Sequence, residues 1–111
     1  SSLGAARADA AQLSQSEIDA FRARLRQCWN TQGLPNDQSL FVLINVSLNT
    51  DGTIAGQPEV VEGQASTFGP ALRDSALRAL YRCQPYTMLR KETYSLWKSM
   101  ELKFTSNMFD G

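Results

Sequence analysis

The stretch LFVLINVSLNTDG, at residues 40–52, contains the most apolar strand and the hairpin turn that we predict for this chain. Its first nine residues carry an aliphatic side chain at every second position: Leu40, Val42, Ile44, Val46 and Leu48. This period of two is typical of a strand that buries one face. The residues from Asn49 to Gly52 then form the turn of a hairpin, in which Gly52 supplies the positive φ that such turns need.

A second strand is expected directly after this turn, from about Thr53 to Glu62. It contains Gly56 and Pro58, and a proline cannot donate a hydrogen bond to a β-ladder. This strand should therefore lie at an edge of the sheet.

A helix is expected before the hairpin, from Leu13 to Trp29. Ser14 suits the N-cap position, and Glu17 three residues later completes a capping box. Four apolar side chains recur at helical spacing and share one face: Ile18, Phe21, Leu25 and Cys28. This pattern predicts a helix that packs one side against the core.

A second helix is expected after the hairpin, from about Phe68 to Arg82. Its apolar stripe contains Phe68, Leu72, Ala76, Ala79, Leu80 and Cys83. Pro85 ends this helix, because a proline cannot continue the helical hydrogen bonding. Residues 88–96 suit a short helix with Tyr94 packed inward.

The last predicted strand runs from Trp97 to Thr105, where apolar and polar side chains alternate. The second helix returns the chain to the same sheet, so this strand should pair with the first one on its free side. We therefore predict an α+β two-layer sandwich, with a three-stranded antiparallel sheet in the order 2-1-3 and both helices on one face. Residues 13–105 form this single domain, between a linker or tail at 1–12 and a C-terminal tail at 106–111.

Composition excludes several classes of function. Eleven Lys and Arg balance eleven Asp and Glu, whereas a nucleic-acid binder normally carries a basic excess. No apolar run is long enough to span a bilayer, so we expect no membrane insertion by this fragment.

No catalytic chemistry is indicated either. The chain has no histidine, which removes histidine-based triads and imidazole metal sites. The carboxylates are scattered and are interpreted as solvated surface groups. We therefore expect a protein that is not an enzyme and that holds no metal and no cofactor.

Cys28 and Cys83 lie far apart in the sequence, each near the end of a predicted helix. Two isolated cysteines do not make a zinc site, which needs four ligands at short spacings. The spacing leaves two interpretations open: two buried free thiols, or one disulfide formed in an oxidising compartment.

Several short motifs together resemble the C-terminal domain of the TolA proteins, which is akin to that of TonB. They are Cys28-Trp29, Asn49-x-Asp51-Gly52, Cys83-x-Pro85-Tyr86, and the later Tyr94, Trp97 and Phe104. The resemblance covers about residues 13–109, and the Ala-rich start of the chain fits it as well. It implies that Cys28 and Cys83 form a disulfide.

The resemblance also implies a cellular role. Such a domain lies in the periplasm, belongs to a protein anchored in the inner membrane, and serves the Tol-Pal system. Its expected partners are TolB and Pal, with TolQ and TolR acting through an N-terminal region absent here, and with colicins and the filamentous phage coat protein as further partners. The system passes proton-motive-force energy to the outer membrane, and supports its integrity and cell division.

The mechanism expected from the resemblance is β-augmentation, in which a disordered N-terminal segment of TolB adds as a strand to an exposed sheet edge. We predict that the last strand provides this edge, through Trp97, Lys98, Ser99, Met100, Glu101, Leu102, Lys103 and Phe104. Tyr94 and Tyr86 are candidates for a groove beside it. The charges on this strand have an alternative role as a barrier to aggregation, and the aromatic residues an alternative role in the core.

Two other functions remain open at this point. One is a TonB-type transducer that contacts outer-membrane transporters. The other is a periplasmic enzyme inhibitor.

Overall fold

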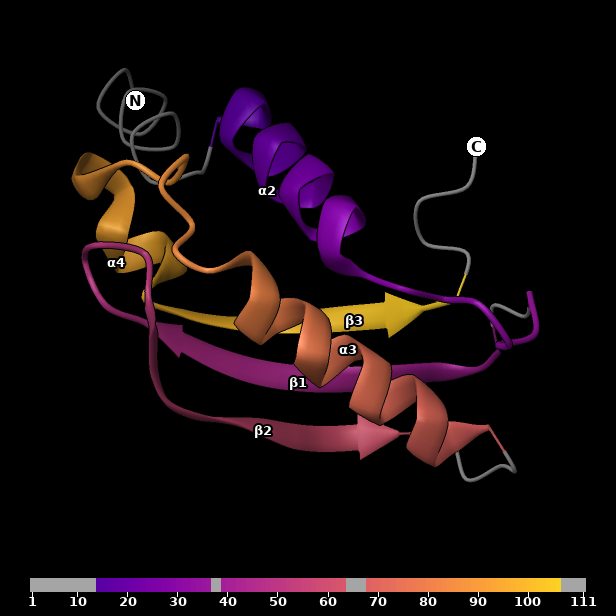
Figure 1. The fold of residues 1–111 in the computed structure, drawn as a ribbon. Helices are drawn as coiled ribbons and strands as arrows, with labels where there is room; N and C mark the ends of the chain where they lie inside the picture. Colours follow the sequence, from indigo (N-terminus) through magenta and orange to yellow (C-terminus); the bar gives the residue numbers. More distant parts are fainter. Residues whose placement is uncertain (1–13, 37–38, 64–67, 107–111) are drawn as a thin grey trace, which may run out of the picture.

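The computed structural model of the protein describes residues 14–36, 39–63 and 68–106 (Figure 1). Along the chain these residues form α2 (Gln15–Cys28), β1 (Phe41–Leu48), β2 (Ile54–Gly63), α3 (Gly69–Cys83), the 3-10 helix η1 (Lys91–Thr93), α4 (Tyr94–Trp97) and β3 (Ser99–Thr105). The expected N-terminal tail and all but the first residue of the expected C-terminal tail lie outside the described residues.

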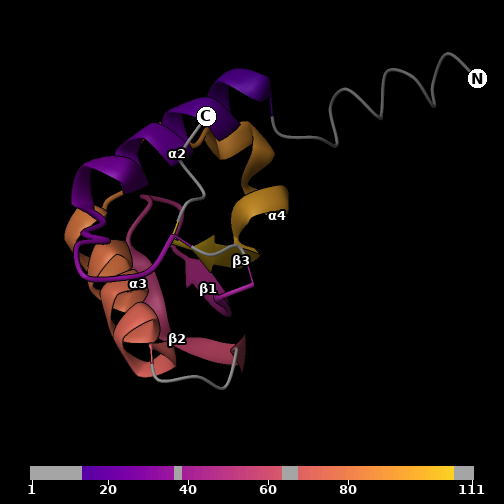
Figure 2. The ribbon, with the colours of Figure 1, turned by 90° about the vertical axis from the view of Figure 1, so that its right-hand side faces the viewer.

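The three strands form one antiparallel sheet in the order β2-β1-β3, as predicted (Figure 1). The predicted aliphatic row on and just before β1 is buried: Leu40, Val42, Ile44, Val46 and Leu48. α2 and α3 lie on the same side of the sheet (Figure 2). The predicted two-layer α+β fold is therefore confirmed, with the most apolar strand at its centre.

α2 begins at the predicted capping box. The backbone N–H of Glu17 donates to the Ser14 hydroxyl at 3.1 Å, and the backbone N–H of Ser14 donates to Glu17 Oε1 at 3.3 Å. Phe21 and Leu25, from the predicted apolar face, are buried in the core. The cap therefore fixes where the helix starts, and the apolar face fixes how it lies on the sheet.

α3 brings most of its predicted apolar stripe into the core. Its buried members are Leu72, Ala76, Ala79, Leu80 and Cys83. Phe68, predicted to belong to the same stripe, is the N-cap residue and is 43% exposed. The prediction was wrong for Phe68 because a cap residue stands at the rim of the helix and need not follow its buried face.

A disulfide joins Cys28 and Cys83, which are the last residues of α2 and α3. Their Cα atoms are 5.8 Å apart, within the range that a disulfide spans. Arg24 adds a second link between the two helices, since its Nε donates to the backbone carbonyl of Cys83 at 3.0 Å. Of the two interpretations of the cysteines, the structure contains the bridge, which holds the C-terminal ends of both helices together.

The last strand begins later than predicted. Trp97 is the final residue of α4 and Lys98 is its C-cap, so neither belongs to β3. Trp97 is fully buried, and its indole N–H donates to the backbone carbonyl of Arg90 at 2.8 Å. The large ring is stabilised by core packing and by this hydrogen bond, which a position on the exposed strand edge would not offer.

The turn between β1 and β2 requires glycine for two reasons. Gly52 has a φ of +86°, as the turn chemistry predicted. A Cβ at this position would also lie 2.7 Å from the backbone N and O of Tyr86. The close approach is held by a hydrogen bond from Tyr86 N–H to the Gly52 carbonyl at 2.8 Å, so the turn docks against the segment that follows α3.

Candidate peptide-binding edge

Within the part of the chain that the structure describes, β3 pairs with β1 on one side and with no strand on the other. It pairs with β1 without interruption from Phe41↔Thr105 to Ser47↔Ser99. The Leu48 N–H donates to the Lys98 carbonyl at 2.9 Å, so Leu48 and Lys98 form a hydrogen-bonded pair at the end of this ladder. Hydrogen-bonded and non-hydrogen-bonded pairs alternate along an antiparallel ladder. The backbone N–H and C=O groups of Ser99, Glu101 and Lys103 therefore point away from β1.

The side chains of β3 alternate as predicted. Met100 and Leu102 are half-buried and Phe104 is fully buried on the core side, whereas Ser99, Glu101 and Lys103 are exposed. The residues with outward backbone groups are therefore those whose side chains stand on the uncovered face of the sheet. An added strand would meet charged side chains on that face and apolar ones on the helix side.

A hollow of about 270 Å³ lies between β3 and α2. Its lining consists of Ile18, Phe21, Arg22 and Leu25 from α2, Leu89 from the preceding loop, and Met100, Glu101, Leu102, Lys103 and Phe104 from β3. Glu101 and Lys103 border the same hollow, although their side chains stand on the other face of the sheet. The arrangement offers backbone hydrogen-bonding groups and an apolar recess next to each other, which are the two requirements for adding an extended peptide.

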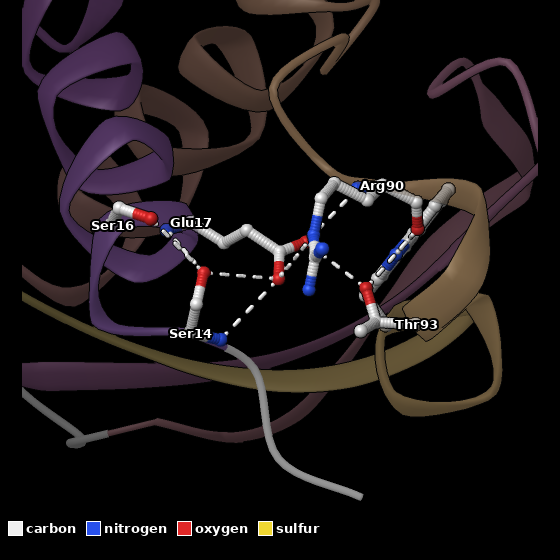
Figure 3. Close-up of polar contacts among 6 residues, drawn as sticks. Ser14, Ser16, Glu17, Arg90 and Thr93 are labelled. Atoms are coloured by element: carbon white, nitrogen blue, oxygen red, sulfur yellow. Dashed lines mark hydrogen bonds and ion pairs between the residues drawn. The ribbon is translucent and has the colours of Figure 1, made fainter. Parts of the chain in front are cut away.

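Glu17 ties α2 to the segment around Arg90 that follows α3, and Figure 3 shows its contacts. Its Oε2 accepts a hydrogen bond from Arg90 N–H at 2.9 Å and one from the Thr93 hydroxyl at 3.0 Å. Its Oε1 lies 3.4 Å from Arg90 Nε. Because Glu17 precedes Ile18 on α2 and Arg90 follows Leu89, this contact holds both lining residues in place.

Glu17 also corrects the prediction that every carboxylate is a solvated surface group, since it is only 4% exposed. Burial by itself raises the pKa of Glu17. Hydrogen bonds from the Arg90 backbone, from Ser14 and from Thr93 outweigh that effect and hold the pKa at about 2. The carboxylate is therefore charged and fully hydrogen-bonded inside the domain at neutral pH.

The opposite edge of the sheet, on β2, is interrupted. Its ladder with β1 has register shifts between Leu43 and Ile44 and between Asn45 and Ser47. Gly56 has a φ of +69°, and the outward N–H of Ile54 already donates to Gln84 Oε1 at 2.8 Å. With Pro58 in the same strand, β2 offers no regular row of free backbone groups.

The structure separates the predicted site residues into two groups. Ser99, Met100, Glu101, Leu102, Lys103 and Phe104 lie on β3, next to the hollow. Tyr86 is 1% exposed and donates its hydroxyl to the Leu80 carbonyl at 2.7 Å, so it belongs to the core and not to a groove. Tyr94 is half-buried and donates its hydroxyl to the Leu48 carbonyl at 2.6 Å.

Sequence reasoning missed the opposite wall of the hollow. Ile18, Phe21 and Leu25 were recognised as an apolar helix face, but that pattern does not distinguish a wall of a hollow from a core contact. Leu89 was included in the short helix predicted over residues 88–96, but it lies before η1, in the connection that follows α3.

Two kinds of site are absent from the described ranges. Within residues 14–36, 39–63 and 68–106, no group of three or more Cys, Asp or Glu side chains could hold a metal ion. The helices in these ranges are also too short or too polar to cross a membrane.

The sequence profile of a family described as "Uncharacterised conserved protein UCP034077" matches residues 11–107. No curated protein and no solved structure matches the chain significantly.

Proposed function

This chain belongs to the family of the uncharacterised conserved protein UCP034077, and from the geometry of its sheet edge we propose that it is a protein-interaction domain. It binds an extended peptide as a fourth strand along β3. The observation that carries this proposal is the coincidence of outward backbone groups at Ser99, Glu101 and Lys103 with an apolar hollow beside them. Backbone hydrogen bonds supply the affinity, and the hollow selects apolar side chains.

We assign this peptide-binding edge to a TolA-like role in the periplasm. The resemblance of the motifs to the TolA C-terminal domain supports the assignment, as does the disulfide, which suits an oxidising compartment. The peptide is then the disordered N-terminal segment of TolB. The edge passes force from the inner membrane to TolB and Pal through a row of backbone hydrogen bonds.

Proline substitutions test this edge. Glu101→Pro removes an outward N–H but leaves the ladder with β1 intact, because Glu101 does not donate to β1. Val60→Pro is the matched control. Val60 lies on β2 opposite Ile44 of β1, and its N–H also points away from β1. We expect Glu101→Pro to weaken binding of a TolB N-terminal peptide about tenfold or more and Val60→Pro to leave it unchanged.

Calorimetry with each variant gives the affinities, and circular dichroism shows that both variants fold. A folded Glu101→Pro variant with wild-type affinity would contradict binding at β3. Binding of plug peptides from outer-membrane transporters, in place of the TolB peptide, would move the assignment from a TolA-like to a TonB-like role while keeping the edge.

A further inference from the structure

Two opposite charges stand next to each other on the outer side of β3. Glu101 and Lys103 are both exposed, and their side chains share the face of the sheet that α2 and α3 leave uncovered. Across the ladder they face Asn45 and Leu43 on β1, neither of which is charged. Among the described residues neither of them forms an ion pair, although Lys103 Nζ lies 5.0 Å from the centre of the Phe41 ring.

A fourth strand would bring one residue directly opposite each of these charges. Residues opposite each other in neighbouring strands have Cβ atoms about 5 Å apart, and opposite charges there stabilise the pair whereas like charges destabilise it. The residue between them would stand opposite Leu102 and turn its side chain to the helix side, where the apolar hollow lies. The edge therefore matches a short pattern of charged, apolar and charged residues.

We propose that Glu101 and Lys103 select the partner peptide by the order of its charges: a basic residue opposite Glu101 and an acidic residue opposite Lys103, with an apolar residue between them. This inference rests on the proposed function, and adds to it the chemistry of the partner. In an antiparallel partner the order along the peptide is acidic, apolar, basic, and in a parallel partner it is the reverse.

A free peptide fits this site better than a second copy of the chain. The segment Glu101-Leu102-Lys103 is itself acidic, apolar, basic, so two β3 strands match in charge when they run antiparallel. The hollow beside the edge, however, is closed on its far side by α2. A second copy would also bring its own α2 to this side of the joined sheet, whereas an extended peptide brings only its side chains.

The two charges have a simpler alternative role, which is to deter pairing of the edge with any other strand. The two roles predict different results when the charges are exchanged or removed. Charges that only oppose edge pairing act alike on all peptides, so neutralising them strengthens the binding of every peptide. Charges that select the partner favour one peptide over another, so exchanging the charges of Glu101 and Lys103 reverses which peptide binds more tightly.

The test uses two synthetic peptides of identical composition, Thr-Val-Asp-Val-Lys-Val-Thr and Thr-Val-Lys-Val-Asp-Val-Thr. Each is titrated by NMR at low salt into the wild-type chain and into the double variant Glu101→Lys with Lys103→Glu. We expect the wild type to prefer one peptide about tenfold and the double variant to prefer the other by a similar factor. Both preferences should fade at about 1 M salt, where exposed charges are screened.

A matched control exchanges two charges elsewhere. Arg73 and Asp74 form an exposed ion pair at 3.3 Å on α3, and the variant Arg73→Glu with Asp74→Lys keeps the same net charge. This control should keep the wild-type preference. Equal affinity of both peptides for the wild type would overturn the inference, and so would tighter binding of both peptides to the neutral variant Glu101→Gln with Lys103→Gln.

Two further outcomes separate this inference from the proposed function. If both peptides bind β3 with equal affinity, the edge binds peptides without reading their charges, and only the inference fails. If neither peptide shifts the amide signals of β3 in any variant at millimolar concentration, the proposed function fails with it. A wild-type dimer in sedimentation that is lost in the single variant Glu101→Lys, which places like charges opposite each other in an antiparallel pair of β3 strands, would make a second copy the occupant and overturn the choice of a peptide.

Discussion

The two edges of the sheet flank the same central strand but differ in almost every feature that controls strand addition. β2 contains Pro58, a positive φ at Gly56 and two register shifts, and its Ile54 N–H is already bonded to Gln84. β3 pairs without interruption with β1 and has its outward groups beside an apolar hollow. Local sequence therefore closes the β2 edge, whereas β3 keeps the regular row of outward groups that strand addition requires.

Distant segments also hold the β2 edge and the hollow beside β3. The β2 side is fastened by the residues after α3, through Gln84 on Ile54 and through Tyr86 on the Gly52 carbonyl. The hollow beside β3 is fastened by the residues before η1, because the Arg90 N–H donates to Glu17 on α2. These two contacts can be broken separately, so their effects on the two edges can be compared.

The largest expected effect comes from breaking the contact on the β2 side. Gly52→Ala places a Cβ against the backbone of Tyr86 and forces a positive φ on a residue that disfavours it. We expect a loss of about 4 kcal/mol in the free energy of unfolding, measured by urea denaturation.

Gly33→Ala is the matched control for this change. Gly33 has a φ of +87°, but a Cβ there would meet nothing within 4 Å. It should cost only the backbone strain, about 1 kcal/mol. Equal losses for the two variants would show that Tyr86 does not brace the turn.

The next effect comes from the contact on the β3 side. The pKa of Glu17 is lowered to about 2 in the folded protein from its ordinary value of 4.5, so its charged form stabilises the fold. This contribution is fully present above about pH 4.5 and is lost as the pH falls towards 2. It amounts to a free energy on the order of 3 kcal/mol.

Glu17→Gln should therefore be less stable than the wild type at pH 7 by about this amount, and nearly as stable as the wild type at pH 2. Thermal unfolding across this pH range measures the difference. Glu92→Gln, at an exposed carboxylate in η1, serves as the control and should follow the wild-type curve. A Glu17→Gln variant that keeps the wild-type acid dependence would show that this contact does not stabilise the wall of the hollow.

The sequence was sufficient for the central hairpin and for the β2 edge. The period of two in β1, Gly52 in the turn and Pro58 in β2 are local signals, and the structure agrees with each of them. They can be predicted from the sequence because each one depends on the backbone preference or the hydrogen-bonding capacity of the residue itself.

The features that the sequence did not reveal depend on distant contacts. Glu17 is recognisable as a capping residue, but its burial depends on Arg90 and Thr93, which lie far along the chain. Trp97 continues the alternation of the strand after it, so the pattern alone placed it on the edge. The hollow needs α2 to lie beside β3, and that placement follows from packing and not from any one segment.

Hydrogen exchange of the outward backbone amides measures whether β3 is an open edge. In the free chain, we expect slow exchange at Ile54, whose N–H is bonded to Gln84, and fast exchange at Glu101 and Lys103. Saturation with the TolB N-terminal peptide should then slow exchange at Glu101 and Lys103. Slow exchange at these two amides in the free chain, or fast exchange at saturation, would contradict an open edge that a peptide strand completes.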